Sequence, residues 1–99
     1  MWRPLSAFVL LAACASPAPE FFGAARRDVR LSGIDFAVWH DGSRAEVVRL
    51  TPLARARRLA VPPLMIQAVE AATGCRVRPG SVRTGMPGDT GEARMALDC

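Results

Sequence analysis

A short apolar segment near the N-terminus decides how much of this 99-residue chain is available to fold. Residues 5–11 are rich in Leu, Ala, Phe and Val, and they follow the positively charged Arg3. A helix needs about 20 apolar residues to span a bilayer, so this segment is too short to do so. Its length is typical of the apolar part of a secretory signal peptide, roughly 7–15 residues. We therefore predict a cleaved signal peptide at residues 1–13, which takes no part in the fold.

The apolar segment ends in Leu11-Ala12-Ala13-Cys14. This sequence resembles the lipobox of bacterial lipoprotein precursors, in which an aliphatic residue and two small residues precede a Cys. The resemblance implies cleavage directly before Cys14, transfer of diacylglycerol to its thiol, and anchoring of the mature chain by several acyl chains. Ala15, in place of Asp, implies sorting to the outer membrane of a Gram-negative host, facing the periplasm. The alternative is cleavage at an ordinary Ala13-Cys14-Ala15 site, which gives a soluble periplasmic or secreted protein.

Removal of the leader leaves 86 residues with twelve Arg, no Lys and nine acidic residues, a formal charge of +3. With Cys14 bound to lipid, Cys75 and Cys99 remain, and an even pair in an exported chain predicts one disulfide. A chain of this length forms at most one small domain, which buries little apolar surface. A covalent cross-link is therefore expected to contribute to its stability.

Two Pro residues mark residues 14–28 as a tether, because Pro17 and Pro19 favour extended backbone over helix. The strongest strand signal follows in residues 29–51, where apolar residues alternate. Their phase slips at Ser32-Gly33, which predicts a glycine bulge that keeps both sets on one face. Asp41-Gly42 predicts a hairpin loop. A two-residue loop there places Phe36 opposite Val47, and Trp39 opposite Arg44, where the two can form a cation–π contact.

A change to helical spacing occurs after Thr51-Pro52, a sequence that suits a helix start. For residues 52–60 helix and loop both stay open, whereas residues 64–73 predict a helix that stops at Gly74. Strand alternation returns in residues 75–77 and 93–99. Antiparallel pairing with Cys75 opposite Cys99 also places Val77 opposite Leu97, so the disulfide and the apolar register agree.

These signals predict a small α+β domain at residues 29–99. It contains an antiparallel sheet, formed by a hairpin and a disulfide-linked strand pair, with a helix packed on one face. Residues 81–84 are a candidate for one more short strand.

Arginines form the first candidate binding site. The set comprises Arg26, Arg27, Arg30, Arg55, Arg57 and Arg58. Guanidinium groups bind the phosphates of lipid or lipopolysaccharide and the carboxylates of a peptide. The alternative is a solvated basic surface in a chain that uses Arg for every positive side chain. An exported address disfavours nucleic acid as a partner.

The sequence contains few residues that could form a catalytic or metal-binding site. His40, beside Asp41, is the only His, and a single His in a hairpin is typical of a turn. A zinc site needs three or four ligands, and the disulfide accounts for both remaining Cys. Every Ser–His–acid set depends on His40. We expect no cofactor and no catalytic residue.

The sequence thus predicts a lipid-anchored, non-enzymatic accessory or adaptor protein of the outer membrane, with an envelope protein as its candidate partner. The alternative is a binding module that recognises an anionic envelope component through the arginine set.

Overall fold

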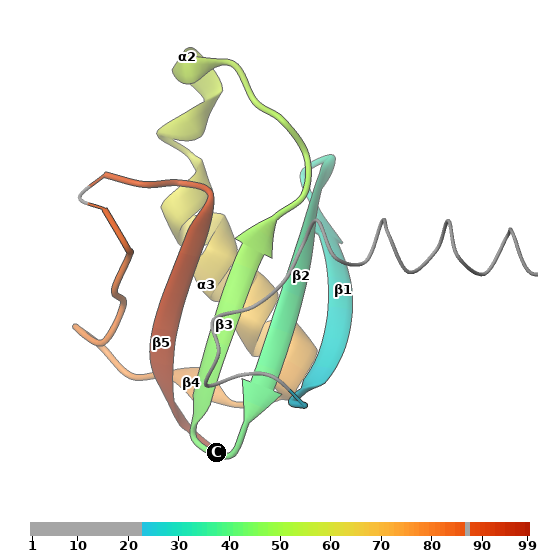
Figure 1. Cartoon of the computed structure of the whole chain (residues 1–99), viewed down its shortest axis with the longest axis vertical. Coiled ribbons are helices and arrows are strands. Elements are labelled where there is room, and N and C mark those ends of the chain that lie inside the picture. The colour runs from blue at the N-terminus through green and yellow to red at the C-terminus, as the bar shows by residue number, and fades with distance from the viewer. Residues whose placement is uncertain (1–22, 87) are drawn as a thin grey trace, which may run out of the picture.

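A computed structural model describes residues 23–86 and 88–99 as one curved antiparallel sheet with a helix packed against it (Figure 1). The strands are β1 (Ala25–Leu31), β2 (Ile34–Asp41), β3 (Arg44–Arg49), β4 (Arg76–Val77) and β5 (Glu92–Asp98), and the helices are α2 (Arg55–Arg58) and α3 (Val61–Thr73). The strand order is β1-β2-β3-β5-β4. The α+β class is therefore confirmed. The predicted signal peptide, the lipobox and Cys14 lie outside the described residues.

The boundary of the predicted tether and the bulge at Ser32-Gly33 both require correction. Strand β1 begins at Ala25, so the last four residues of the segment predicted as a tether, 14–28, belong to the sheet. Ser32 and Gly33 form the two-residue loop of a hairpin in which Leu31 pairs with Ile34. Both have positive φ, +52° and +77°, as a type I′ turn requires. A bulge and this turn both place the two apolar sets on one face, so alternation alone does not distinguish them.

The register of the β2–β3 hairpin differs from the prediction by two residues. Phe36 pairs with Arg49 and Val38 with Val47, because the loop is Gly42-Ser43 and Asp41 pairs with Arg44. Gly42 takes the first loop position with φ +60°, as in a type II′ turn. This loop requires positive φ only of the glycine.

Trp39 lies opposite Glu46, and its cation–π contact is with Arg26 of β1, not with Arg44. The Arg26 guanidinium carbon lies 5.2 Å from the ring centroid. Arg26 and Trp39 are paired in the β1–β2 register, so they share the face of the sheet that points away from α3.

The segment after β3 contains two helices. Residues 52–60, left open between helix and loop, form only the four-residue α2. Thr51 caps no helix: its Oγ1 accepts a hydrogen bond from the Asp35 backbone N–H at 2.9 Å. Helix α3 begins at Val61, earlier than predicted, because Pro in a first turn has no N–H that needs a partner. Its end at Thr73 is confirmed, with Gly74 at φ +72°.

The pairing at the cysteines is as predicted. Cys75 and Cys99 form a disulfide with Cα atoms 4.4 Å apart, and Val77 pairs with Leu97. The wider strand pairing differs, because β5 also pairs with β3 and all five strands form one sheet. Residues 81–84 contribute only an isolated bridge, from Arg83 to Arg94.

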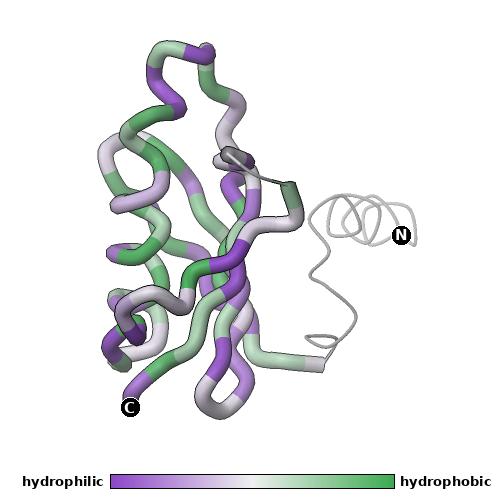
Figure 2. The backbone as a smooth tube through the Cα atoms, turned by 90° about the vertical axis from the view of Figure 1, so that its left-hand side faces the viewer, coloured by the Kyte–Doolittle hydropathy of each residue, from purple (hydrophilic) through white to green (hydrophobic). Residues whose placement is uncertain are grey.

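The core lies between the sheet and α3, which Figure 2 shows on one side of the strands. Its buried side chains are Ile34, Phe36, Val38, Ala45, Val47, Leu53, Val61, Met65, Ala68, Val69, Cys75, Ala93, Met95 and Leu97. A second, smaller cluster on the opposite face holds Ala37 and Trp39, packed by Ala24 and Val48. Within residues 23–86 and 88–99, no helix has the length and apolar character needed to cross a membrane.

Candidate anion-binding groove

The end of the domain beyond the last residues of β3 carries an open groove of about 450 Å³. It lies between α2 and the loop that precedes β5, at the end of the sheet where α2 is labelled in Figure 1. The lining residues are Arg49, Arg55, Arg58, Leu59, Gly88, Asp89 and Thr90. Three arginines from two different elements therefore face one space.

Each of these arginines has a structural reason for its position. Arg49 ends β3; its backbone N–H donates to the Gly91 carbonyl at 2.9 Å, and its Nη1 donates to Thr90 Oγ1 at 3.1 Å. Arg55 and Arg58 are three residues apart in α2, a spacing that places side chains on the same side of a helix. Nε of Arg58 donates to the Leu53 carbonyl at 3.0 Å.

The electrostatic character of the groove is positive. Among its lining residues Asp89 is the only acid, and its Oδ1 already accepts a hydrogen bond from the Gly91 N–H at 2.7 Å. Guanidinium groups stay charged at any physiological pH and offer five N–H donors each. Such a set suits a phosphate or carboxylate, which guanidinium binds through two parallel hydrogen bonds.

An exposed apolar side chain lies beside these charges. Leu59, directly after α2, is 87 % exposed. The tube in Figure 2 shows the same contrast at the α2 end, where hydrophilic and hydrophobic segments are adjacent. A single exposed Leu is ordinary on a protein surface, so the arginines and not Leu59 define the chemistry of this groove.

The predicted arginine set is divided by the fold. Arg57 lines a different groove, of about 310 Å³, with Ser32, Ile34, Ala60, Pro63 and Leu64. Arg26 contacts Trp39 and donates from Nε to Asp28 Oδ1 at 2.9 Å. Arg27, the next residue along β1, is on the opposite face of the sheet. Of the predicted residues, only Arg55 and Arg58 are brought together here.

Sequence reasoning missed Arg49. It contacts the groove only because residues 88–91 fold back onto the end of β3, an arrangement with no local sequence signal.

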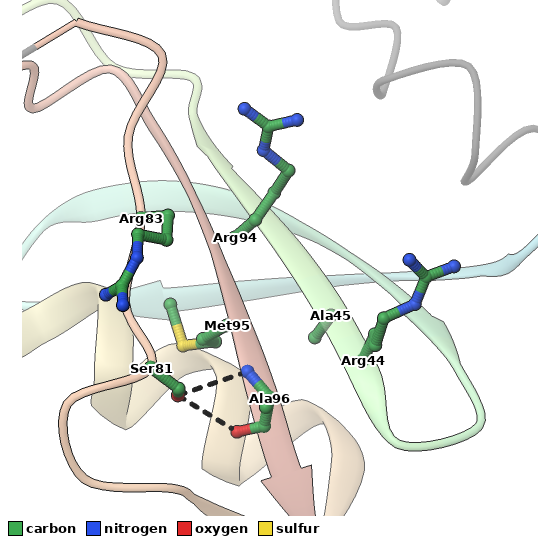
Figure 3. Close-up of a pocket in the computed structure, with 7 residues that line it drawn as sticks. All are labelled: Arg44, Ala45, Ser81, Arg83, Arg94, Met95 and Ala96. Carbon is green, nitrogen blue, oxygen red and sulfur yellow. Dashed lines mark hydrogen bonds between the residues drawn. The ribbon is translucent and has the colours of Figure 1, made fainter.

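A smaller pocket of about 170 Å³ lies where β3, β5 and residues 81–83 meet (Figure 3). It is lined by Arg44, Arg83 and Arg94, but Figure 3 shows their guanidinium groups pointing in different directions. Arg83 Nη1 donates to the carbonyls of Gly80 and Val82, each at 2.9 Å. This pocket is therefore less suited to a single anion than the groove at α2.

His40, predicted as a turn residue, and the two predicted disulfide cysteines lie at the other end of the sheet. His40 is half-buried near the end of β2, and its Nε2 donates to the Gly42 carbonyl at 2.7 Å. Cys75 is buried and Cys99 is exposed. There Arg78 donates to Asp98 at 2.7 Å, and this hydrogen bond to a carboxylate raises the pKa of the guanidinium.

Comparison of the chain with protein families, with curated proteins and with solved structures yields no match.

Proposed function

We propose that this protein is a lipid-anchored accessory protein of the bacterial envelope, held at the outer membrane through Cys14. The sequence Leu11-Ala12-Ala13-Cys14, placed directly after an apolar segment of signal-peptide length, carries the proposal. The small disulfide-linked domain is consistent with an exported protein, because disulfides persist in oxidising compartments.

The length of the tether is compatible with the groove facing the membrane. Residues 15–24 separate Cys14 from β1 and can span at most roughly 35 Å. Strand β1, with seven residues, is about 23 Å long. The tether is therefore long enough for either end of the sheet to face the bilayer.

A second function, binding of anionic envelope components, is favoured by the groove of Arg49, Arg55 and Arg58. Its ligand chemistry is the phosphate group, as found in anionic phospholipid and in lipopolysaccharide. Each basic residue near an anionic membrane surface contributes about 1 kcal/mol of binding free energy. Loss of three arginines therefore predicts a weakening by about 3 kcal/mol, or roughly 150-fold.

The anchor is tested with the substitution Cys14→Ser in a Gram-negative host. The unmodified protein is expected in the outer-membrane fraction, and the variant as an unprocessed precursor that is missing from that fraction. Normal processing of the variant into a soluble periplasmic chain would instead support the ordinary signal-peptide alternative.

The groove is tested with the triple variant Arg49→Gln, Arg55→Gln and Arg58→Gln, in a chain that also carries Cys14→Ser. Sedimentation with vesicles of anionic phospholipid, and separately with lipopolysaccharide, measures binding to the two phosphate sources. Vesicles of zwitterionic lipid give the background.

The matched control removes the same charge elsewhere, from the exposed side chains of Arg76, Arg78 and Arg83. Near-wild-type binding by the control and loss of binding by the groove variant would support the assignment. Equal loss in both would indicate that net charge alone drives binding, and equal retention would show that the groove arginines do not bind the phosphate group.

A further inference from the structure

Three metal-ligating side chains meet at the end of the sheet opposite the groove. One ring nitrogen of His40 and the sulfurs of Cys75 and Cys99 lie within 4.8 Å of one another. His40 comes from the end of β2, Cys75 lies between α3 and β4, and Cys99 follows β5. The Leu97 N–H donates to the Ser43 carbonyl at 2.7 Å, which ties β5 to the β2–β3 hairpin. Figure 1 shows the chain end at Cys99 beside this hairpin.

The hydrogen bond of His40 defines which ring nitrogen can ligate. Nε2 lies 2.7 Å from the Gly42 carbonyl oxygen, an acceptor that carries no hydrogen. Nε2 must therefore hold the proton, which leaves the lone pair of the neutral ring on Nδ1. A backbone carbonyl that accepts from one nitrogen while the other binds metal is the usual outer-shell arrangement of a metal-bound His.

We propose that the reduced form of the protein binds Zn²⁺ through His40, Cys75 and Cys99, and that the disulfide is the metal-free, oxidised form of the same site. In the reduction, a dithiol reductant transfers two electrons and two protons to the Cys75–Cys99 bond and itself becomes a disulfide. Zn²⁺ then binds two thiolates and the imidazole, and the two thiol protons are released to solvent.

The ligand set fits zinc in number, charge and reach. Thiolate and imidazole are the ligands that Zn²⁺ prefers, and two thiolates neutralise its charge. Zn–S distances of about 2.3 Å place tetrahedral ligand atoms about 3.7 Å apart, so the two sulfurs must move apart after reduction, while the ring nitrogen already lies within 4.8 Å of them. Three protein ligands leave the fourth coordination position to water.

The consequence is a domain that remains cross-linked in both redox states. Strand β4 pairs with β5 through only two residue pairs, Arg76 with Asp98 and Val77 with Leu97. A zinc ion between Cys75 and Cys99 would hold this end together after reduction. The inference rests on the described domain alone and does not depend on the lipid anchor.

The test uses the full chain with Cys14→Ser, so that only Cys75 and Cys99 supply thiols. The protein is reduced with a dithiol, desalted without oxygen, and titrated with Zn²⁺ in competition with a chromophoric chelator. One Zn²⁺ per reduced chain and none per oxidised chain is expected. Co²⁺ in place of Zn²⁺ is expected to show thiolate-to-cobalt charge transfer and tetrahedral absorption bands.

His40→Gln is expected to weaken Zn²⁺ binding by at least about tenfold. Loss of a hydrogen-bond partner of a ligand already has an effect of that size, and here a ligand itself is lost. It should also shift the Co²⁺ spectrum, because a nitrogen ligand is lost. Asp41→Asn is the matched control in the same hairpin and should leave both readouts unchanged. The proposal would be overturned if His40→Gln binds Zn²⁺ as tightly as the parent does. It would also be overturned if the reduced parent binds no stoichiometric Zn²⁺.

Reduction could itself unfold the domain, so the folding of the reduced chain is followed by circular dichroism. In that case Zn²⁺ must restore the native helical signal of the parent at one equivalent. Failure to do so also overturns the proposal.

Discussion

Replacing both Cys75 and Cys99 by Ala removes the disulfide that links the end of α3 to the end of β5. The cysteines are 24 residues apart, so the disulfide closes a loop of 25 residues in the unfolded chain. In the chain-entropy model, loss of this constraint destabilises the native state by about 3.5 kcal/mol.

This loss is large relative to the stability that a domain of this size can have. At 0.05–0.15 kcal/mol per residue, residues 23–99 have a total free energy of unfolding of roughly 4–12 kcal/mol. For a domain of this length, 3.5 kcal/mol corresponds to a fall in Tm of about 20 °C.

Urea denaturation of the parent and of the double variant, followed by circular dichroism in the presence of a metal chelator, measures the difference directly. Addition of a reductant should lower the stability of the parent to that of the variant and leave the variant unchanged. A difference below about 1 kcal/mol would refute the reasoning, because the loop-closure term would then be absent.

Three further substitutions test the packing, the helix end and the aromatic contact. Phe36 is the largest fully buried side chain among the residues that the structure describes, and Phe36→Ala should cost about 3–5 kcal/mol, measured by urea denaturation. In Gly74→Ala the added Cβ meets open space, but an L residue is forced to φ +72°. We expect the free energy of unfolding to fall by about 1–2 kcal/mol in thermal or urea unfolding, and no change would contradict the left-handed end of α3. Arg26→Ala removes the contact with Trp39, and a loss of about 0.5–1 kcal/mol with a change in Trp39 fluorescence is expected, whereas Arg27→Ala should leave that fluorescence unchanged.

The pairing of Val77 with Leu97 was predictable because two separate constraints, the cysteines and the apolar alternation, required the same register. Where only one constraint existed, the prediction was less complete. Alternation correctly placed the two apolar sets of residues 29–38 on one face, but it did not separate a bulge from a turn at Ser32-Gly33. Both arrangements put the same side chains on the same face.

The start of α3 shows a limit of a different kind. Pro62 and Pro63 are read from the sequence as a break between two helical segments, but proline is also accepted in the first turn of a helix. The sequence alone does not distinguish a break from a helix start, and in the structure α3 starts at Val61. The hairpin register likewise depended on one residue, since placing Gly42 in the first loop position moves every pair of β2 and β3 by two.

The candidate sites were predictable only where their residues are close in sequence. The spacing of Arg55 and Arg58 places them on one side of a helix, and in the structure both line the same groove. Arg49 contacts the loop at 88–91, and His40 lies near Cys99. Both neighbours are about 40 or more residues away in the sequence. No local pattern encodes such contacts.

The anchor is tested most directly by the intact mass of the protein purified from outer membranes of a Gram-negative host. We predict a chain that begins at Cys14 and carries the added mass of a diacylglyceryl group, with an amide-linked acyl chain on the freed amine. An unmodified chain that begins at Ser16, as cleavage after Ala13-Cys14-Ala15 would produce, would contradict the proposed lipid anchor.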